Sequence, residues 1–143
     1  MKGSNMRHKR FLTLALIFGL GIIGCATMGG LKKAPLDEGQ SQTYSCEYKT
    51  VLKATQSAVA ESGLRIEETY QPDENSWAII GKTGVSTNAI GTSYGTMVRV
   101  VVKKLSDAKT KVTVLTKKKS SIDLQAKGDY SKSIFGSIEV KIQ

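Results

Sequence analysis

Two valine-rich segments in the second half of the chain place the strongest limit on its fold. The first runs from Thr96 to Leu105 and the second from Thr110 to Lys117, with residues 106–109 between them. Successive side chains of a β-strand point to opposite faces, so alternate valines of each segment fall on one face. Two such segments joined by a short connection are typical of a hairpin. We therefore predict an antiparallel β-hairpin over 96–117.

Apolar residues at spacings of three and four predict two helices. The first extends from Tyr48 to Ser62, with Ser45 as the expected N-cap and Gly63 as the left-handed residue that ends it. The second follows Asp129, which is its expected N-cap. Its apolar face consists of Tyr130, Ile134, Phe135, Ile138 and Ile142.

Alternation over residues 64–70 and an apolar run over 76–82 predict two more strands, with a turn at 72–75. Residues 84–95 are mostly small, and we expect them to form a loop. The order helix, four strands, helix predicts an α+β fold in which two helices pack on one face of a four-stranded antiparallel sheet. The open face of that sheet and the 84–95 loop are then the expected places for a binding surface.

The first 25 residues have the parts of a secretory signal. Residues 1–10 contain four Lys or Arg and no acid, residues 11–23 contain no charge, and the small residue Gly24 precedes Cys25. A membrane-spanning helix needs about 20 apolar residues, which is more than this run provides. The sequence from Ile22 to Cys25 resembles the lipobox of bacterial lipoproteins.

This resemblance implies cleavage between Gly24 and Cys25, followed by attachment of diacylglycerol to the Cys25 thiol and usually of an acyl chain to its amino group. No other cofactor is expected. Residue 26 is Ala and not Asp, which in Gram-negative lipoproteins implies sorting to the outer membrane. We therefore expect the periplasmic face of the outer membrane, with the inner membrane or a Gram-positive cell surface as alternatives. An ordinary signal-peptidase site is the other interpretation of Cys25. The expected domains are a signal peptide over 1–24, a lipidated cysteine and flexible tether over 25–43, and one folded domain over 44–143.

Charge is distributed unevenly along the mature chain. Residues 26–75 contain five bases and eight acids, for a net charge of −3, whereas 76–143 contain twelve bases and four acids, for +8. We expect four lysines to share the solvent face of the hairpin as a patch for anionic surfaces: Lys103, Lys109, Lys111 and Lys117. Lipid headgroups, cell-wall carboxylates or an acidic protein would suit such a patch, and a solvated face without a partner is the alternative. Nucleic acid is not an expected partner of an exported chain, and the sequence leaves the oligomeric state open.

The sequence contains no complete pattern for catalysis or metal binding. Its one histidine, His8, lies in the expected signal peptide, so the mature chain lacks a residue that titrates near neutral pH without perturbation. Residues 81–83 imitate the end of a phosphate-binding loop, but Ser76 replaces the first glycine of that motif. Composition leaves open a Ser–Lys dyad that uses Ser120, Ser121, Ser131 or Ser133. We expect no enzymatic activity and no metal, and we interpret Cys46 as a buried structural thiol.

The C-terminal segment, with Gly128, Asp129, Ser133, Ile134 and Ile138, and the helix end at residues 62–64 resemble small uncharacterised lipoprotein domains of Gram-negative bacteria. The resemblance implies a tethered cysteine followed by helix, antiparallel strands and a closing helix, and it implies no activity. The 84–95 insert departs from it. The architecture is also loosely similar to helix-grip domains of lipoproteins that assist outer-membrane barrel assembly. The sequence thus favours a structural or adaptor lipoprotein that binds protein or cell wall; the alternative is a small-ligand or lipid binder using the open face and the 84–95 loop.

Overall fold

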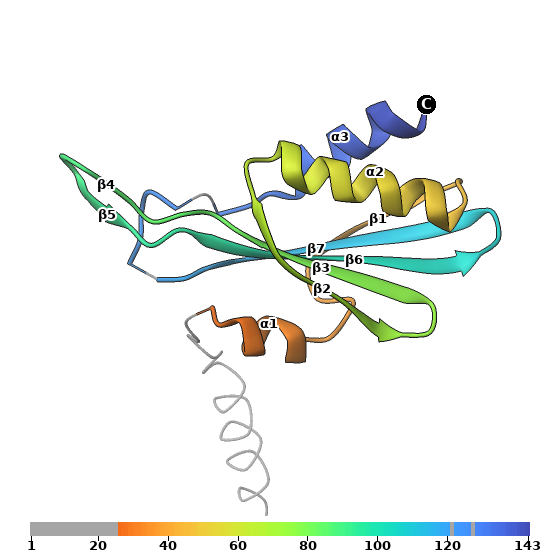
Figure 1. Ribbon diagram of the computed structural model, residues 1–143, viewed down its shortest axis with the longest axis horizontal. Helices are drawn as coiled ribbons and strands as arrows, with labels where there is room; N and C mark the ends of the chain where they lie inside the picture. The colour runs from red at the N-terminus through yellow and green to blue at the C-terminus, as the bar shows by residue number, and fades with distance from the viewer. Residues whose placement is uncertain (1–25, 121, 127) are drawn as a thin grey trace, which may run out of the picture.

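A computed structural model describes residues 26–143 except 121 and 127 (Figure 1). The predicted signal peptide and the lipidation site at Cys25 lie outside the described residues. The fold is α+β, as predicted, and its main sheet is antiparallel with strand order β1-β7-β6-β3-β2. Its strands are β1 (Gln40–Tyr44), β2 (Arg65–Asp73), β3 (Ser76–Lys82), β6 (Thr96–Ser106) and β7 (Lys109–Lys118). The sheet therefore has five strands, and the prediction of four was wrong.

The valine-rich hairpin is confirmed as the pair β6 and β7. Val100 lies opposite Val114, and Val102 lies opposite Val112. All four are buried, at 2% exposure or less. Because fully burying a valine side chain contributes about 1.5–3 kcal/mol, this row of side chains supplies much of the core.

Helices α2 (Tyr48–Glu61) and α3 (Ser131–Ile142) cover one face of the sheet side by side (Figure 1). Both were predicted, and Gly63 ends α2 with a φ of +77°. The predicted N-cap Ser45 was wrong, because Glu47 precedes α2 and makes no side-chain capping bond. The predicted N-cap Asp129 of α3 was wrong as well, because Tyr130 is the N-cap and makes no side-chain capping bond. Asp129 lies one residue earlier, and its Oδ1 accepts a hydrogen bond from the Ser131 N–H at 2.9 Å.

The opposite face is partly covered by residues 26–39, which we call the strap. The strap contains α1 (Met28–Lys33), whose Leu31 is fully buried with Ile80, Met97 and Leu115. The prediction of a flexible tether over 25–43 is therefore wrong for the described residues, since this segment carries both α1 and most of β1. The face opposite α2 and α3 was expected to be partly open, and α1 covers part of it (Figure 1). Among the described residues, no helix is long and apolar enough to cross a bilayer.

Arg99 holds the strap against the sheet. It lies in the middle of β6 and is fully buried. Its guanidinium donates hydrogen bonds to the carbonyl oxygens of Leu31, Ala34 and Pro35 at 2.7, 2.6 and 2.6 Å. The last carbonyls of a helix lack partners within the helix and form the negative end of its dipole. The arginine therefore satisfies the end of α1 with both hydrogen bonds and charge.

Glycine is required where the strap turns into β1. Gly39 has a φ of +122°, which side chains rarely adopt, and a Cβ there would lie 2.3 Å from the Val114 carbonyl oxygen. This close approach lets β1 pair with β7 along the edge of the sheet. The strap is thus fixed at both ends, by Arg99 under α1 and by the β1 pairing after Gly39.

Candidate functional site

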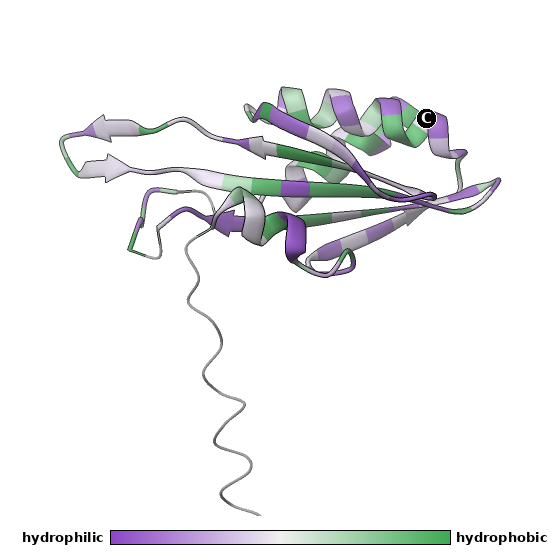
Figure 2. Ribbon diagram, turned by 60° about the horizontal axis from the view of Figure 1, so that its bottom comes forward, coloured by the Kyte–Doolittle hydropathy of each residue, from purple (hydrophilic) through white to green (hydrophobic). Residues whose placement is uncertain are grey.

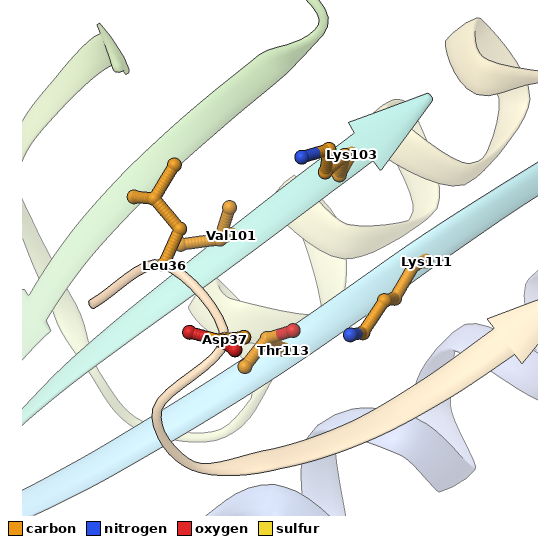
Figure 3. Close-up of a pocket in the computed structure, with 6 residues that line it drawn as sticks. All are labelled: Leu36, Asp37, Val101, Lys103, Lys111 and Thr113. Carbon is orange, nitrogen blue, oxygen red and sulfur yellow. The ribbon is translucent and has the colours of Figure 1, made fainter. Parts of the chain in front are cut away.

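Lys103 of β6 and Lys111 of β7 lie directly opposite one another on the face that the strap covers in part. They line a hollow of about 310 Å³ with Val101 and Thr113 from the strands and Leu36 and Asp37 from the strap (Figure 3). Among the described residues, neither lysine has a carboxylate within 4.0 Å. We call this place the lysine hollow; it combines two ammonium groups, one exposed carboxylate and an apolar floor.

Alternation along β7 places Lys109 and Lys117 on the same face as Lys111, but neither of them lines the lysine hollow. Lys117 forms an ion pair with Glu38 of the strap, with 3.1 Å between Nζ and Oε1. Lys109 begins β7 opposite Ser106, at the end of the hairpin, and is exposed. The structure brings together only Lys103 and Lys111. Binding of an anionic surface by the four lysines stays a prediction.

Residues 84–95 were predicted to be a loop, and this was wrong in part. They contain the two short antiparallel strands β4 (Ser86–Asn88) and β5 (Gly91–Ser93), which extend beyond one end of the main sheet (Figure 1). Residues 122–126 lie beside this small hairpin, where Asn88 Nδ2 donates a hydrogen bond to Gln125 Oε1 at 2.8 Å. We call residues 83–95 and 122–126 together the tip.

Asp123 fastens the two parts of the tip together and is only 5% exposed. Its Oδ2 accepts hydrogen bonds from Ser93 Oγ at 2.9 Å, from the Tyr94 N–H at 2.6 Å and from the Gly95 N–H at 3.2 Å. Its Oδ1 accepts from the N–H groups of Gln125 and Ala126. Burial alone would raise the pKa of this carboxyl, but the hydrogen bonds from Ser93 and the backbone outweigh that effect and hold its pKa below the ordinary value. The tip is therefore braced from inside by one buried anion.

The outside of the tip is apolar. Ile90, Ile122 and Leu124 are 85%, 82% and 92% exposed, and Val85 and Tyr94 are more than half exposed. Ile90 and Leu124 lie beside the same shallow hollow between the two parts of the tip. Figure 2 shows the hydrophobic turn at the end of the β4–β5 hairpin. Single exposed apolar residues are ordinary, but several gathered on neighbouring loops mark a contact surface.

Of the four serines considered for a Ser–Lys dyad, Ser121 lies outside the described residues, and the hydroxyls of Ser131 and Ser133 have partners other than lysine. Ser131 is buried and donates from its hydroxyl to Asp129, and Ser133 lies within hydrogen-bond distance of Ser62 at 3.2 Å. Cys46, interpreted from the sequence as a buried thiol, is half-buried and packs against the core. Among the described residues, no group of three or more His, Cys, Asp and Glu side chains could hold a metal ion.

Sequence reasoning did not identify the two buried charges that shape these surfaces. Arg99 could have been noticed, because it interrupts a run of valines from Val98 to Val102. Asp123 gives no comparable signal, since its partners at residues 93–95 are about 30 positions away in the chain. The structure also separates the two parts of the predicted ligand site: the lysine hollow contains no residue of 84–95.

Comparison with protein-family models finds no match, and no curated protein matches the sequence either.

Proposed function

We propose that this chain is a lipid-anchored binding module of the cell envelope that holds an acidic segment of a partner protein in the lysine hollow. Cys25 would carry the lipid, at the periplasmic face of the outer membrane. The module would act as an adaptor, without catalysis and without a metal. The lipobox at residues 22–25 supports the anchor, and the arrangement of Lys103 and Lys111 supports the binding role.

The observation that carries the binding role is the placement of two lysines opposite one another. Like charges at opposite positions of neighbouring strands destabilise a sheet, by an amount comparable to the roughly 0.2–1 kcal/mol that a favourable pair contributes. Here no carboxylate of the described residues lies within 4.0 Å of Lys103 or Lys111, and Asp73 attracts Lys103 electrostatically at longer range. A carboxylate from a partner would remove this repulsion and could also accept from the nearby Thr113 hydroxyl.

Distance favours a protein over headgroups next to the anchor. Ala26, the neighbour of Cys25, packs into the cluster of Met97, and Lys103 lies six residues further along β6. At about 3.4 Å per residue this is about 20 Å along the strand. Interactions between exposed charges are screened within about 8 Å at physiological salt. The lysine hollow is therefore better placed to bind a protein that extends away from the membrane surface than to bind the headgroups next to the anchor.

Photocrosslinking in living cells tests the proposal. A photoreactive amino acid would replace Asp37, which is exposed at the rim of the lysine hollow. We expect a discrete protein adduct, and we expect Lys103→Glu with Lys111→Glu to reduce its yield about tenfold or more. The matched control is Lys49→Glu with Lys132→Glu, two exposed lysines on α2 and α3, which should leave the yield unchanged.

Two outcomes would count against this function. If Lys103→Glu with Lys111→Glu leaves the yield of the adduct unchanged, the lysine hollow does not bind the partner. Adducts with lipid or peptidoglycan in place of protein would reject a protein partner and favour the headgroup or cell-wall alternative.

A further inference from the structure

The tip combines exposed apolar side chains with an absence of exposed charge. Among Asp, Glu, Lys, Arg and His, residues 83–95 and 122–126 contain only Asp123, and that carboxylate is buried and accepts five hydrogen bonds. Ile90, Ile122 and Leu124 are each more than 80% exposed. Water around these side chains is released if they enter an apolar medium, which favours such transfer.

Lysines lie at the base of the tip. Lys82 ends β3, Lys118 ends β7 and Lys119 follows it, so all three lie at the junction between the main sheet and the tip. Lys82 also forms an ion pair with Glu67, with 2.7 Å between Nζ and Oε2, so Lys118 and Lys119 are the basal lysines better placed to meet headgroups. Lys118 also donates a hydrogen bond from Nζ to the Asp123 carbonyl oxygen at 3.2 Å. Apolar side chains that enter a bilayer are commonly flanked by lysines, whose ammonium groups stay at the level of the headgroups.

Ala26, the described residue that follows the expected point of lipid attachment, lies at the same end of the molecule. Ala26 and Met28 pack into the cluster that contains Met97. Met97 is the register partner of Lys82, the last residue of β3, and of Lys117, the next-to-last residue of β7, so it lies next to the points where the chain leaves the sheet for the tip. Figures 1 and 2 both place the start of α1 toward the end of the sheet from which β4 and β5 project.

We propose that the tip enters the membrane leaflet that holds the Cys25 lipid, with Ile90, Ile122 and Leu124 among the acyl chains and the basal lysines at anionic headgroups. This inference rests on the proposed lipid anchor. The lipid and the tip would then make two contacts with one bilayer and fix the orientation of the domain. Asp123 acts as a positioning residue, because it holds the two loops of the tip together.

Depth measurements on the mature acylated protein test this inference. A Cys46→Ala background leaves no free thiol, since the thioether blocks Cys25, and an environment-sensitive fluorophore is attached at Ile90→Cys or at Leu124→Cys. The matched control is Val140→Cys on α3, an apolar position that is 77% exposed on the other face of the sheet. The protein is reconstituted in vesicles of phosphatidylethanolamine and phosphatidylglycerol that contain brominated acyl chains. All three variants replace exposed residues, and equal urea midpoints would confirm that they fold alike.

We expect brominated chains to quench the two tip labels at least about threefold more strongly than the Val140 label. Equal quenching at all three positions, in protein that floats with the vesicles, would overturn the inference and leave the lipid anchor intact. If the intact mass shows that Cys25 is not acylated, the anchor is wrong, and the tip labels are read in Cys25→Ser versions of the same three variants, so that no other thiol is labelled, after mixing with the vesicles. Quenching of the tip labels would then still support insertion of the tip into the bilayer, and the absence of quenching would reject it.

Discussion

Two buried charges, one of each sign, are the residues on which this structure depends most. Arg99 donates to three carbonyl oxygens of the strap, and Asp123 accepts from four backbone N–H groups and one hydroxyl. Removing a charge from water costs several kcal/mol, and hydrogen bonds must offset that cost. In both cases the partners are mostly backbone groups of segments without a core of their own. Each charge thus orders a segment that composition alone would leave as coil.

For Asp123, we expect a dependence of stability on pH that disappears in Asp123→Asn. The folded state lowers the pKa of this carboxyl below its ordinary 3.8, so it favours the ionised form. The contribution to stability is therefore complete above the ordinary pKa and is lost as the pH falls through that value and below it. Asparagine would also present an N–H donor toward the donors of residues 93–95.

Urea unfolding at pH 7 and at pH 2 measures this effect. The variant should unfold at lower urea than the wild type at pH 7, and the difference should shrink at pH 2. Asp107→Asn is the matched control, because the Asp107 side chain is 98% exposed and its ion pair with Lys104 contributes little. A difference that persists unchanged at pH 2 would mean that the charge of Asp123 is not what holds the tip together.

At the scale of elements, the strap is held to the sheet by Arg99. In Arg99→Met the carbonyl oxygens of Leu31, Ala34 and Pro35 lose their donors, and hydrogen bonds to charged groups contribute about 1.5–3 kcal/mol each when buried. We expect the free energy of unfolding to fall by about 2–4 kcal/mol, which is less than the sum because a detached strap regains water. Limited trypsin digestion should then cut faster after Lys32 and Lys33.

Arg65→Met is the control for this change. Arg65 is exposed and pairs with Glu67 on the surface, so its loss should change stability by less than about 0.5 kcal/mol and leave the strap protected. Equal digestion rates for Arg99→Met and the wild type would contradict the role of Arg99 in holding the strap.

The elements differ in how much their own sequence reveals. The β6–β7 hairpin, α2 and α3 were predictable, because each carries a periodic apolar face that its own residues display. The strand β1 has the sequence Gln-Ser-Gln-Thr-Tyr, and only its tyrosine is buried. Its strand conformation depends on hydrogen bonding to the edge of β7. Helix α1 has six residues and one buried side chain, so it depends on Arg99 and on the second small core. Tertiary contacts decide such elements, and a local pattern cannot show them.

The two candidate surfaces could be predicted to different degrees. Lys103 and Lys111 were placed on one face from strand alternation, and the structure brings them together as register partners. The sequence predicts a loop over residues 84–95 of the tip, because β4 and β5 have three residues each and no apolar alternation. Its bracing by Asp123 joins segments about 30 residues apart, which no local pattern reports.

At the scale of the whole molecule, the two candidate surfaces lie at different places along β6. The tip projects beyond Thr96, next to the strap residue that follows Cys25, and the lysine hollow lies toward the other end of the strand. A lipid at Cys25 would place the tip at the bilayer and the lysine hollow on the side that faces away from the bilayer. This division of roles depends on the proposed lipid anchor at Cys25.

Acylation of Cys25 is therefore the most direct test. Cells that express the chain are labelled with radioactive palmitate, and the protein from the membrane fraction is analysed by intact mass. We expect a polypeptide that begins at Cys25 and carries a diacylglycerol and an N-acyl chain, with no label in Cys25→Ser and full label in Cys46→Ser. Equal palmitate incorporation in the wild type and Cys25→Ser, or a mature chain of unmodified mass, would contradict the account.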